Sequence, residues 1–198
     1  IMFLHVGLGN PGSEHKLDRH NIGFMAIDHL LNFYRINDTL KKKFNGHYYK
    51  LSQKNGTIFF LKPQTFMNNS GSSVSSLIKF FSIKPSSVIV WHDEIDLDKG
   101  RIKVKFGGGH GGHNGIRDII KHIGENFLRV RIGIGRPDNN LDPSKWVLSS
   151  FYKNEFDDWV NDLLSIMASE VELLHLNNSI DFMNRVAILR NNQNIEIM

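Results

Sequence analysis

Two residues in separate parts of this sequence have the side chains needed for acid–base chemistry. His20 follows the glycine-rich stretch Gly7-Leu8-Gly9-Asn10-Pro11-Gly12, and Asp93 follows the apolar run 88–91. A histidine changes its charge near neutral pH, and a carboxylate on one ring nitrogen fixes the tautomer and raises the basicity of the ring. Together, His20 and Asp93 could take a proton from water.

Three asparagines, Asn10, Asn68 and Asn114, stand in loops that could join this pair. Their amide N–H groups could hold a carbonyl oxygen as it becomes an oxyanion, which is worth about 10²- to 10³-fold per donor. The sequence has no cysteine and no Gly-x-Ser-x-Gly elbow, so no covalent nucleophile stands out. The pattern favours hydrolysis by an activated water.

Metal-assisted hydrolysis is an alternative, because His92, Asp93, His110 and His113 could be arranged as ligands. Their spacing is not diagnostic, since the last two histidines stand in a glycine loop and not on a rigid helix. We favour a site without metal or cofactor.

A nucleotide site is a second alternative, because Gly7, Gly9 and Gly12 satisfy G-x-G-x-x-G after an apolar run. In that fingerprint a helix opens inside the motif and receives the pyrophosphate. Here seven mostly polar residues follow Gly12 before any helical periodicity begins, which argues against a nucleotide.

The elements that must position these residues follow from hydrophobic periodicity and turn signals. We predict strands at 2–6, 46–52, 57–61, 88–91, 101–106 and 127–134, and helices at 22–34, 72–81, 116–123, 156–174 and 180–189. In open α/β sheets, ligands gather beyond the carboxyl ends of central strands. The loops that carry His20, Asp93 and the three asparagines should therefore meet at one sheet edge.

Cations are concentrated in a few places. Lys103 and Lys105 alternate with apolar residues, which predicts a basic face on one strand beside the glycine loop 107–115. Such a loop lets a ligand approach main-chain donors, which favours phosphate binding. The run 41–43 is read as a solvated loop, and the polar loop 137–143 as a candidate lid.

The composition bounds the class of protein. A chain of 198 residues suits a single domain over 1–198, and we expect Ile1 to be a remnant and 190–198 a flexible tail. The net charge of +4 is compatible with a polyanionic partner. No apolar window is long enough to span a membrane, and the absence of cysteine fits a reducing compartment, so we expect a cytoplasmic protein.

Six motifs, taken together, are specific. They are Gly-Leu-Gly-Asn-Pro-Gly at 7–12, Arg-His-Asn-x-Gly at 19–23, Phe-Met-Asn-x-Ser-Gly at 66–71, His-Asp-Glu-x-Asp at 92–96, the glycine loop at 107–115, and Arg-Ile-Gly-Ile-Gly at 131–135. In this order they closely resemble the bacterial peptidyl-tRNA hydrolase family, and the resemblance runs from Phe3 to about Leu189.

The resemblance implies a single-domain α/β fold with a mixed, twisted sheet flanked by helices. It implies a monomeric enzyme, without an obligate protein partner, that hydrolyses the ester between peptide and tRNA. His20 would activate water, Asp93 would orient and polarise His20, and Asn10 would contact the substrate near the ester. Other positions that match substrate or tRNA contacts of the family are Phe66, Met67, Asn68, His113, Asn114, Lys103, Lys105 and Arg131.

Two positions depart from the family pattern. His15 stands where the family usually has a tyrosine that contacts substrate, which puts that contact in doubt. Lys99 replaces a residue that is often proline or apolar. Two other functions stay open at this point: a non-catalytic RNA-binding protein, because the implied fold also resembles a chloroplast intron-splicing factor, and an esterase for small substrates.

Overall fold

The computed structural model describes residues 1–36, 40–137 and 141–196, and its centre is a sheet of seven strands in the order β2-β3-β4-β1-β5-β7-β6. The strands are β1 (Met2–Gly7), β2 (Lys41–Lys43), β3 (Gly46–Gln53), β4 (Gly56–Pro63), β5 (Val88–Glu94), β6 (Ile102–Phe106) and β7 (Leu128–Gly133). The four strands β4, β1, β5 and β7 are parallel, and the flanking pairs are antiparallel. The predicted mixed α/β sheet is confirmed.

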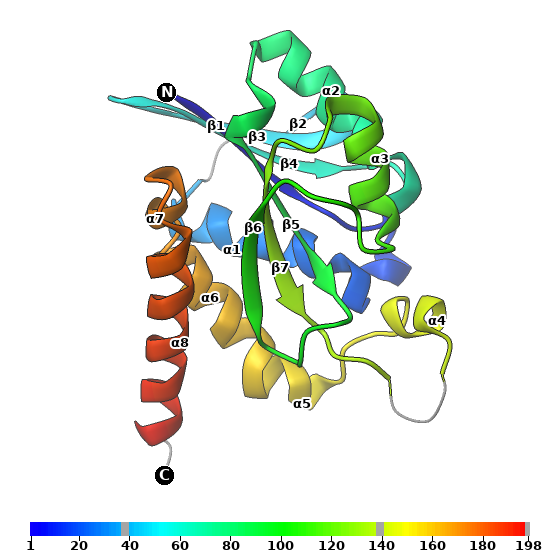
Figure 1. Cartoon of the computed structure of the whole chain (residues 1–198), viewed down its shortest axis with the longest axis vertical. Coiled ribbons are helices and arrows are strands. Elements are labelled where there is room, and N and C mark those ends of the chain that lie inside the picture. The colour runs from blue at the N-terminus through cyan, green and yellow to red at the C-terminus, as the bar shows by residue number, and fades with distance from the viewer. Residues whose placement is uncertain (37–39, 138–140, 197–198) are drawn as a thin grey trace.

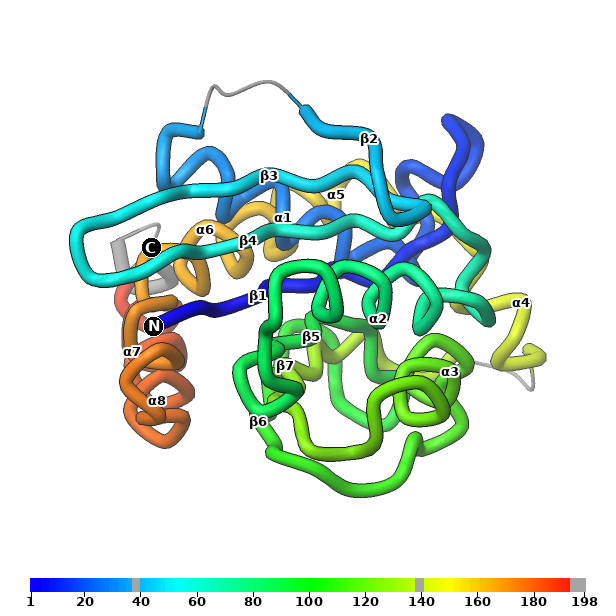
Figure 2. The backbone as a smooth tube through the Cα atoms, turned by 90° about the horizontal axis from the view of Figure 1, so that it is seen from above, coloured from blue at the N-terminus to red at the C-terminus, as the bar shows by residue number. Residues whose placement is uncertain are grey.

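Helices cover both faces of the sheet (Figures 1 and 2). They are α1 (Ile22–Phe33), α2 (Ser70–Phe81), α3 (Asn114–Ile123), α4 (Pro143–Val147), α5 (Lys153–Glu155), α6 (Asn161–Ser169), α7 (Glu172–His175) and α8 (Ser179–Glu196). One core joins α1, α6 and α8 to one face, and a second joins α2 and α3 to the other. Among the described residues, no helix combines the length and apolar character needed to cross a membrane.

The lysine run 41–43 is a strand and not the solvated loop that we expected. β2 pairs with β3 as an exposed edge strand, and Lys41 lies over the ring of Tyr48 while Lys43 lies 4.0 Å from the ring centre of Phe80. Aromatic rings beneath the ammonium groups favour this arrangement, and lysines on an edge strand discourage pairing with another chain.

The single helix expected over 156–174 is broken into several pieces. After α5 comes one π-helical turn (Phe156–Val160), then α6, and the chain turns at Glu170 before α7. The predicted apolar face is still buried, with Val160, Leu163 and Leu174 in the core. Periodicity therefore predicted burial correctly but not the interruptions.

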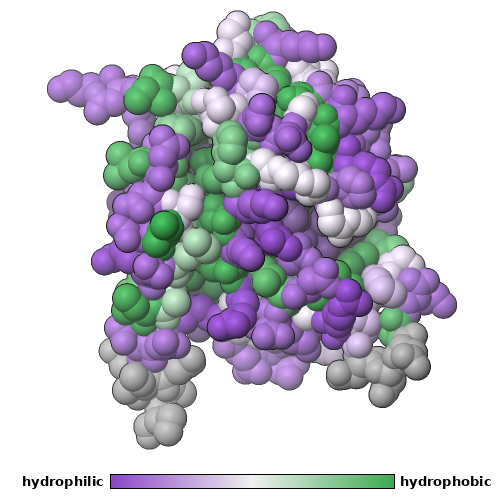
Figure 3. All heavy atoms as spheres, in the orientation of Figure 1, coloured by the Kyte–Doolittle hydropathy of each residue, from purple (hydrophilic) through white to green (hydrophobic). Residues whose placement is uncertain are grey.

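The last helix is longer than expected. α8 runs from Ser179 to Glu196, so the backbone of the expected tail at 190–198 is helical as far as Glu196. Figure 3 shows apolar side chains among polar ones along this helix, where Ile180 and Ile188 are exposed. Residues 197–198 lie outside the described part of the chain, as do 138–140 of the candidate lid.

Main-chain packing at the end of β1 fixes the start of α1. The N–H of Leu8 donates to the carbonyl of Trp91 on β5, and the N–H of Phe24 donates to the carbonyl of Leu8. Gly23 lies against both partners so closely that an added Cβ would collide with the backbone of Leu8 and Trp91. Glycine is required at this close approach, which draws the turn with His20 onto the end of β5.

A chain of hydrogen bonds joins the sheet to α7. The indole N–H of Trp91 donates to Nδ1 of His5 at 3.0 Å, so Nε2 of His5 carries the proton and donates to Nε2 of His175 at 2.8 Å. Nδ1 of His175 then donates to Glu172 at 3.1 Å, and the hydroxyl of Tyr34 donates to the same carboxylate. This pattern of donors and acceptors requires both imidazoles to be neutral.

Candidate active site

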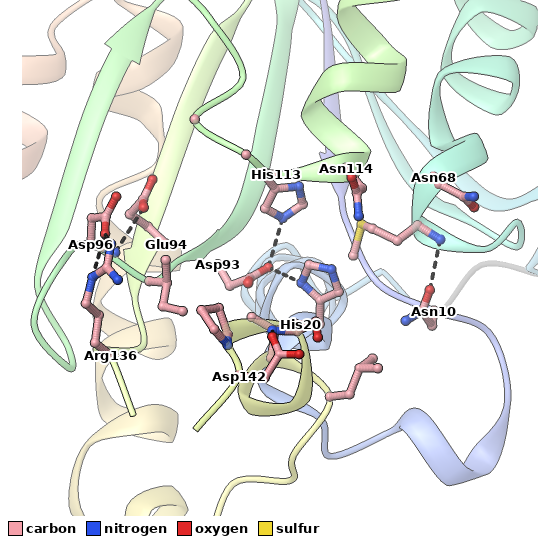
Figure 4. Close-up of a pocket in the computed structure, with 18 of the residues that line it drawn as sticks. Asn10, His20, Asn68, Asp93, Glu94, Asp96, His113, Asn114, Arg136 and Asp142 are labelled. Atoms are coloured by element: carbon pink, nitrogen blue, oxygen red, sulfur yellow. Dashed lines mark hydrogen bonds and ion pairs between the residues drawn. The ribbon is translucent and has the colours of Figure 1, made fainter. Parts of the chain in front are cut away.

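A cleft of about 600 Å³ opens at the carboxyl ends of the central parallel strands. Figure 4 shows His20, Asp93 and His113 at its centre and the three asparagines on one side. The lining residues that we predicted from the sequence are Asn10, His20, Phe66, Met67, Asn68, Asp93, His113 and Asn114. The prediction that these loops meet at one sheet edge is confirmed.

His20 and Asp93 are in direct contact. Nδ1 of His20 lies 2.8 Å from Oδ1 of Asp93, and both side chains are nearly buried. His20 sits in a short 3₁₀ turn (Arg19–Asn21) just before α1, while Asp93 is still within β5, which stays paired with β7 through Glu94. Because Nδ1 donates to the carboxylate, Nε2 is left as the basic nitrogen of the ring.

His113 also bonds to the same carboxylate oxygen, with Nε2 at 3.0 Å from Oδ1 of Asp93. Its other nitrogen, Nδ1, accepts the N–H groups of Gly115 and Ile116 and so caps the start of α3. A nitrogen that accepts has no proton, so the cap fixes His113 as a donor through Nε2. Oδ1 of Asp93 therefore accepts from two histidines.

The electrostatics of the pair follow from burial and contact. Burial alone would lower the pKa of His20, but the adjacent Asp93 carboxylate outweighs it and raises that pKa above its ordinary value of 6.5. Burial opposes ionisation of Asp93, yet His20 and His113 hold its pKa well below the usual range. The carboxylate is therefore ionised at neutral pH and His20 is a stronger base than a free imidazole.

Asn10 is held by a small network of its own. Its backbone N–H donates to Oδ1 of Asn21, and Nδ2 of Asn21 donates back to the carbonyl of Asn10. Oδ1 of Asn10 accepts the backbone N–H of Met67 at 2.8 Å. With its oxygen engaged in this way, Asn10 can present its amide N–H₂ to the cleft, which suits contact with a carbonyl oxygen.

The other predicted residues of the cleft wall differ in exposure. Phe66 is 65% exposed, whereas Met67 is buried and packs in the core beside α3. Asn68 lies at the rim, and Oδ1 of Asn114 accepts from the guanidinium of Arg117 at 3.0 Å. The buried thioether of Met67 forms part of the cleft floor.

Four predicted residues lie outside the cleft lining. Lys103 and Lys105 are on β6 at the edge of the sheet, with Arg131 opposite Lys103 on β7. The guanidinium of Arg131 bonds to Glu94 at 2.8 and 2.9 Å. His15 bonds to Asp18 at 2.7 Å and not to any residue of the cleft.

The sequence indicated the other wall of the cleft only in part, through the candidate lid 137–143, of which Asp142 and Pro143 line the cleft. This wall is formed by Ile95, by an exposed pair in which Arg136 contacts Asp96 at 2.6 Å, and by the α4 segment. Because we predicted that strand β5 ends at Trp91, we predicted no position for the residues after Asp93. The Asp-Pro-Ser sequence at 142–144 is a helix start, because Oδ1 of Asp142 accepts the N–H of Ser144.

The histidines proposed as metal ligands are only partly brought together. Nδ1 of His92 donates to the carbonyl of Asp93, and Nδ1 of His110 accepts the N–H of Gly112. Among the described residues, the one group whose donor atoms lie within 4.8 Å of one another is His20, Asp93 and His113. The G-x-G-x-x-G stretch opens only a three-residue 3₁₀ turn (Ser13–His15), and the α-helix α1 begins at Ile22.

Fold and site together define an α/β protein with a histidine–carboxylate pair in a cleft at the carboxyl ends of parallel strands. The family model described as peptidyl-tRNA hydrolase matches residues 4–195. The chain belongs to the peptidyl-tRNA hydrolase family. The resemblance found in the sequence motifs is thereby confirmed.

Individual relatives agree with this assignment. The chain is 45% identical over 186 residues to a peptidyl-tRNA hydrolase of Rickettsia africae, which covers 94% of this chain and 100% of that protein. It is 44% identical to one of Novosphingobium aromaticivorans, with 94% and 97% covered. A crystal structure of peptidyl-tRNA hydrolase from Acinetobacter baumannii has a TM-score of 0.84 and 41% identity, covering 93% of this chain and 94% of that one.

Proposed function

We propose that this protein hydrolyses the ester between the peptide and the 3′ end of tRNA, with His20 as general base. Hydrolysis of peptidyl-tRNA is the reaction of the family to which the chain belongs. The observation that carries the residue assignment is the bond of 2.8 Å between Nδ1 of His20 and Asp93, which leaves Nε2 basic toward the cleft.

The reaction needs one water and no covalent intermediate. Nε2 of His20 takes a proton from water as the oxygen attacks the carbonyl carbon of the ester. The amide N–H₂ of Asn10 donates to the carbonyl oxygen as it gains negative charge, and Asp93 stabilises the imidazolium that forms. Collapse breaks the bond to the ribose oxygen, which receives the proton from His20, and a peptide acid and free tRNA result.

The donor set of the cleft supports chemistry without a metal. Ligation through Nε2 of His113 would require the ring proton to move to Nδ1, where two backbone N–H groups of α3 already donate. Ligation through Nδ1 of His20 would likewise displace its bond to Asp93. A divalent ion bound by Nε2 of His113 would thus remove the cap on α3, and one bound by Nδ1 of His20 would remove the catalytic hydrogen bond.

The tRNA is proposed to lie along the β6 side of the cleft. Lys103 and Lys105 are exposed there, next to Arg131, and together they present three cations near the glycine loop. Contacts of this kind neutralise phosphates without reading sequence, as expected for a protein that must accept many tRNAs. The bond of Arg131 to Glu94 makes the two lysines the stronger candidates.

The peptide is proposed to follow the opposite side, along Asn10, Asn68 and Asn114 with Phe66 at the rim. His15 occupies the position at which the family usually has a substrate-contacting tyrosine. Its imidazole bonds to Asp18, three residues further along the chain.

We also propose that the protein acts as a cytoplasmic monomer, and light scattering on the purified chain checks its oligomeric state.

The test compares release of free tRNA from an N-blocked aminoacyl-tRNA and from the unblocked form, with and without chelator. We expect chelator-resistant cleavage of the blocked substrate only, lost in His20→Asn. His122→Asn is the matched control, because His122 also contacts a carboxylate, Asp118 at 3.6 Å, but lies outside the cleft lining.

Each contrary result has a distinct meaning. Retained tRNA binding without cleavage by the wild type would indicate a non-catalytic RNA-binding protein. Loss of activity with chelator would restore the metal alternative. Cleavage of small esters with no salt dependence would indicate a general esterase, since only a polyanionic substrate loses affinity steeply as salt rises.

A further inference from the structure

The residue before His20 is a buried cation. Arg19 is 0% exposed, and its guanidinium bonds to both carboxylate oxygens of Glu155 at 3.0 and 2.6 Å. Nζ of Lys99 approaches the same carboxylate at 3.2 Å. The departure of Lys99 from the family pattern therefore adds a second cation to this carboxylate.

Aromatic rings enclose the same guanidinium. Its carbon lies 3.9 Å from the ring centre of Trp146 and 4.7 Å from that of Phe151. The indole N–H of Trp146 in turn donates to the carbonyl of Gly135 at 2.7 Å. Stacking of this kind is specific to the planar guanidinium, which bonds in its plane and packs on its faces.

Main-chain bonds run beside this contact. The N–H of Arg19 donates to the carbonyl of Ser149 at 3.0 Å, and the N–H of Phe151 donates to the carbonyl of Leu17 at 2.9 Å. Asp18 and Ser150 form an antiparallel bridge between them. The segment before His20 is thus joined to the segment after α4 by backbone and side chain together.

The segment held in this way is one wall of the cleft. Pro143, Ser144, Val147 and Leu148, from α4 and the residue after it, line the cleft. None of the five residues of α4 is fully buried, although Trp146 and Val147 pack against the core. The place of α4 beside His20 depends on Trp146 and on the residues that follow it.

A buried ion pair is weak evidence for a contribution to stability, because removing two charges from water costs about as much as their attraction returns. Its geometric effect is easier to see here, since a bidentate and stacked guanidinium fixes distance and orientation. We propose that Arg19 is a positioning residue that holds the α4 wall against the substrate and so sets substrate affinity, without touching substrate itself. This inference rests on the proposed function.

The inference predicts a split between kinetic constants. Removing the guanidinium of Arg19 leaves the bond between His20 and Asp93 in place. It also leaves the bond from the N–H of Asn21 to the carbonyl of Asp18. The chemical step should therefore survive while binding weakens. For Arg19→Met we expect KM for the N-blocked aminoacyl-tRNA to rise about 10- to 100-fold, as for other displaced positioning groups, with kcat within about threefold.

The experiment measures kcat, KM and the pH profile for Arg19→Met, Trp146→Leu and a matched control. Arg185→Met removes another bidentate arginine, bonded to Glu170 at 2.6 and 3.1 Å on the exposed side of α8. We expect Arg19→Met and Trp146→Leu to raise KM with an unchanged pH profile, and the control to match the wild type. Arg19→Lys keeps the positive charge but not the bidentate guanidinium, so its KM should lie between those of the wild type and Arg19→Met.

Amide hydrogen exchange tests the same inference without any turnover. The N–H groups of Trp146 and Ser149, bonded within the α4 segment, should exchange about tenfold faster in Arg19→Met, while those of β5 stay protected. If Arg19→Met does not fold, Trp146→Leu and Arg19→Lys carry both measurements.

The outcomes separate this inference from the proposed function. An inactive wild type would overturn the proposed function, whereas an active wild type with variants of unchanged KM and unchanged exchange would overturn only the positioning role. A fall in apparent kcat at constant KM would indicate a lower fraction of folded enzyme, and with it a merely structural Arg19.

Discussion

Replacing Asp93 by asparagine separates the charge of this side chain from its capacity to accept hydrogen bonds. An asparagine could turn either its oxygen or its nitrogen toward the two rings. His113 determines which orientation forms. Its Nδ1 caps α3, so its Nε2 carries the proton, and an amide nitrogen at position 93 would place two donors against each other. The amide oxygen should therefore face both histidines, and His20 should keep its tautomer.

The expected loss of kcat in Asp93→Asn is limited because the tautomer of His20 is kept. Complete removal of a general base costs about 10²- to 10⁴-fold. Since Asp93→Asn would preserve the tautomer and remove only the charge that stabilises the imidazolium, we expect kcat to fall by about 10²- to 10³-fold, or about 3 to 4 kcal/mol in the barrier. The pKa of His20 should also fall below its ordinary value, because burial then acts without the Asp93 carboxylate to oppose it.

The assay is kcat for the N-blocked aminoacyl-tRNA as a function of pH, together with a titration of His20 by NMR. In the wild type, activity should rise as His20 loses its proton, at a pH above 6.5. In Asp93→Asn this rise should move to lower pH. A rise that stays in place or moves to higher pH would contradict the assigned electrostatics.

The double variant tests the role given to His113. In Asp93→Asn with His113→Ala the amide is free to turn, so His20 loses its enforced tautomer and the total loss should approach about 10⁴-fold. If the single variant Asp93→Asn already loses as much activity as His20→Asn, the amide orientation argued from the α3 cap is wrong.

Three further predictions address the base, the tRNA contact and stability. His20→Asn should keep the melting temperature close to that of the wild type while kcat falls by more than in Asp93→Asn, by about 10⁴-fold, and near-normal turnover would exclude His20 as the base. Lys103→Ala with Lys105→Ala should raise KM and reduce the slope of log KM against log salt by about one to two, and an unchanged slope would argue against phosphate contact. Burial lowers the pKa of both His5 and His175. As pH falls below 6.5, these imidazoles therefore bind protons in the unfolded chain but stay neutral in the folded one. Stability should therefore decline in that direction, and urea unfolding at neutral and mildly acid pH should show a smaller decline in His5→Gln, whereas equal declines would contradict the proposed neutral pair.

Much of the site could be predicted because its residues follow strongly apolar runs. The run 88–91 predicts a strand buried on both faces, and Asp93 at its carboxyl end then has to reach the sheet edge. The prediction placed the end of that strand too early, since backbone pairing with β7 continues through Glu94. Polar side chains at a strand end give no hydrophobic signal that pairing continues.

Other parts of the site depend on partners far apart in sequence. The second hydrogen bond of His113 needs the position of Asp93, and the burial of Arg19 needs Glu155 and Trp146. Local propensity favours an exposed arginine, so only the assembled fold identifies this one as buried. The lysine strand β2 was missed for a similar reason, because the aromatic rings beneath it come from other segments.

Because Gly23 packs so closely against Leu8 and Trp91, the His20 side of the cleft should resist heat better than the α4 wall. The backbone there has no side chain that could rotate to relieve strain or open a gap, so the His20 turn and β5 can part only when the core itself unfolds. The α4 wall has no such packing. As the temperature rises, the affinity for substrate should therefore fall before the hydrogen bond between His20 and Asp93 is lost.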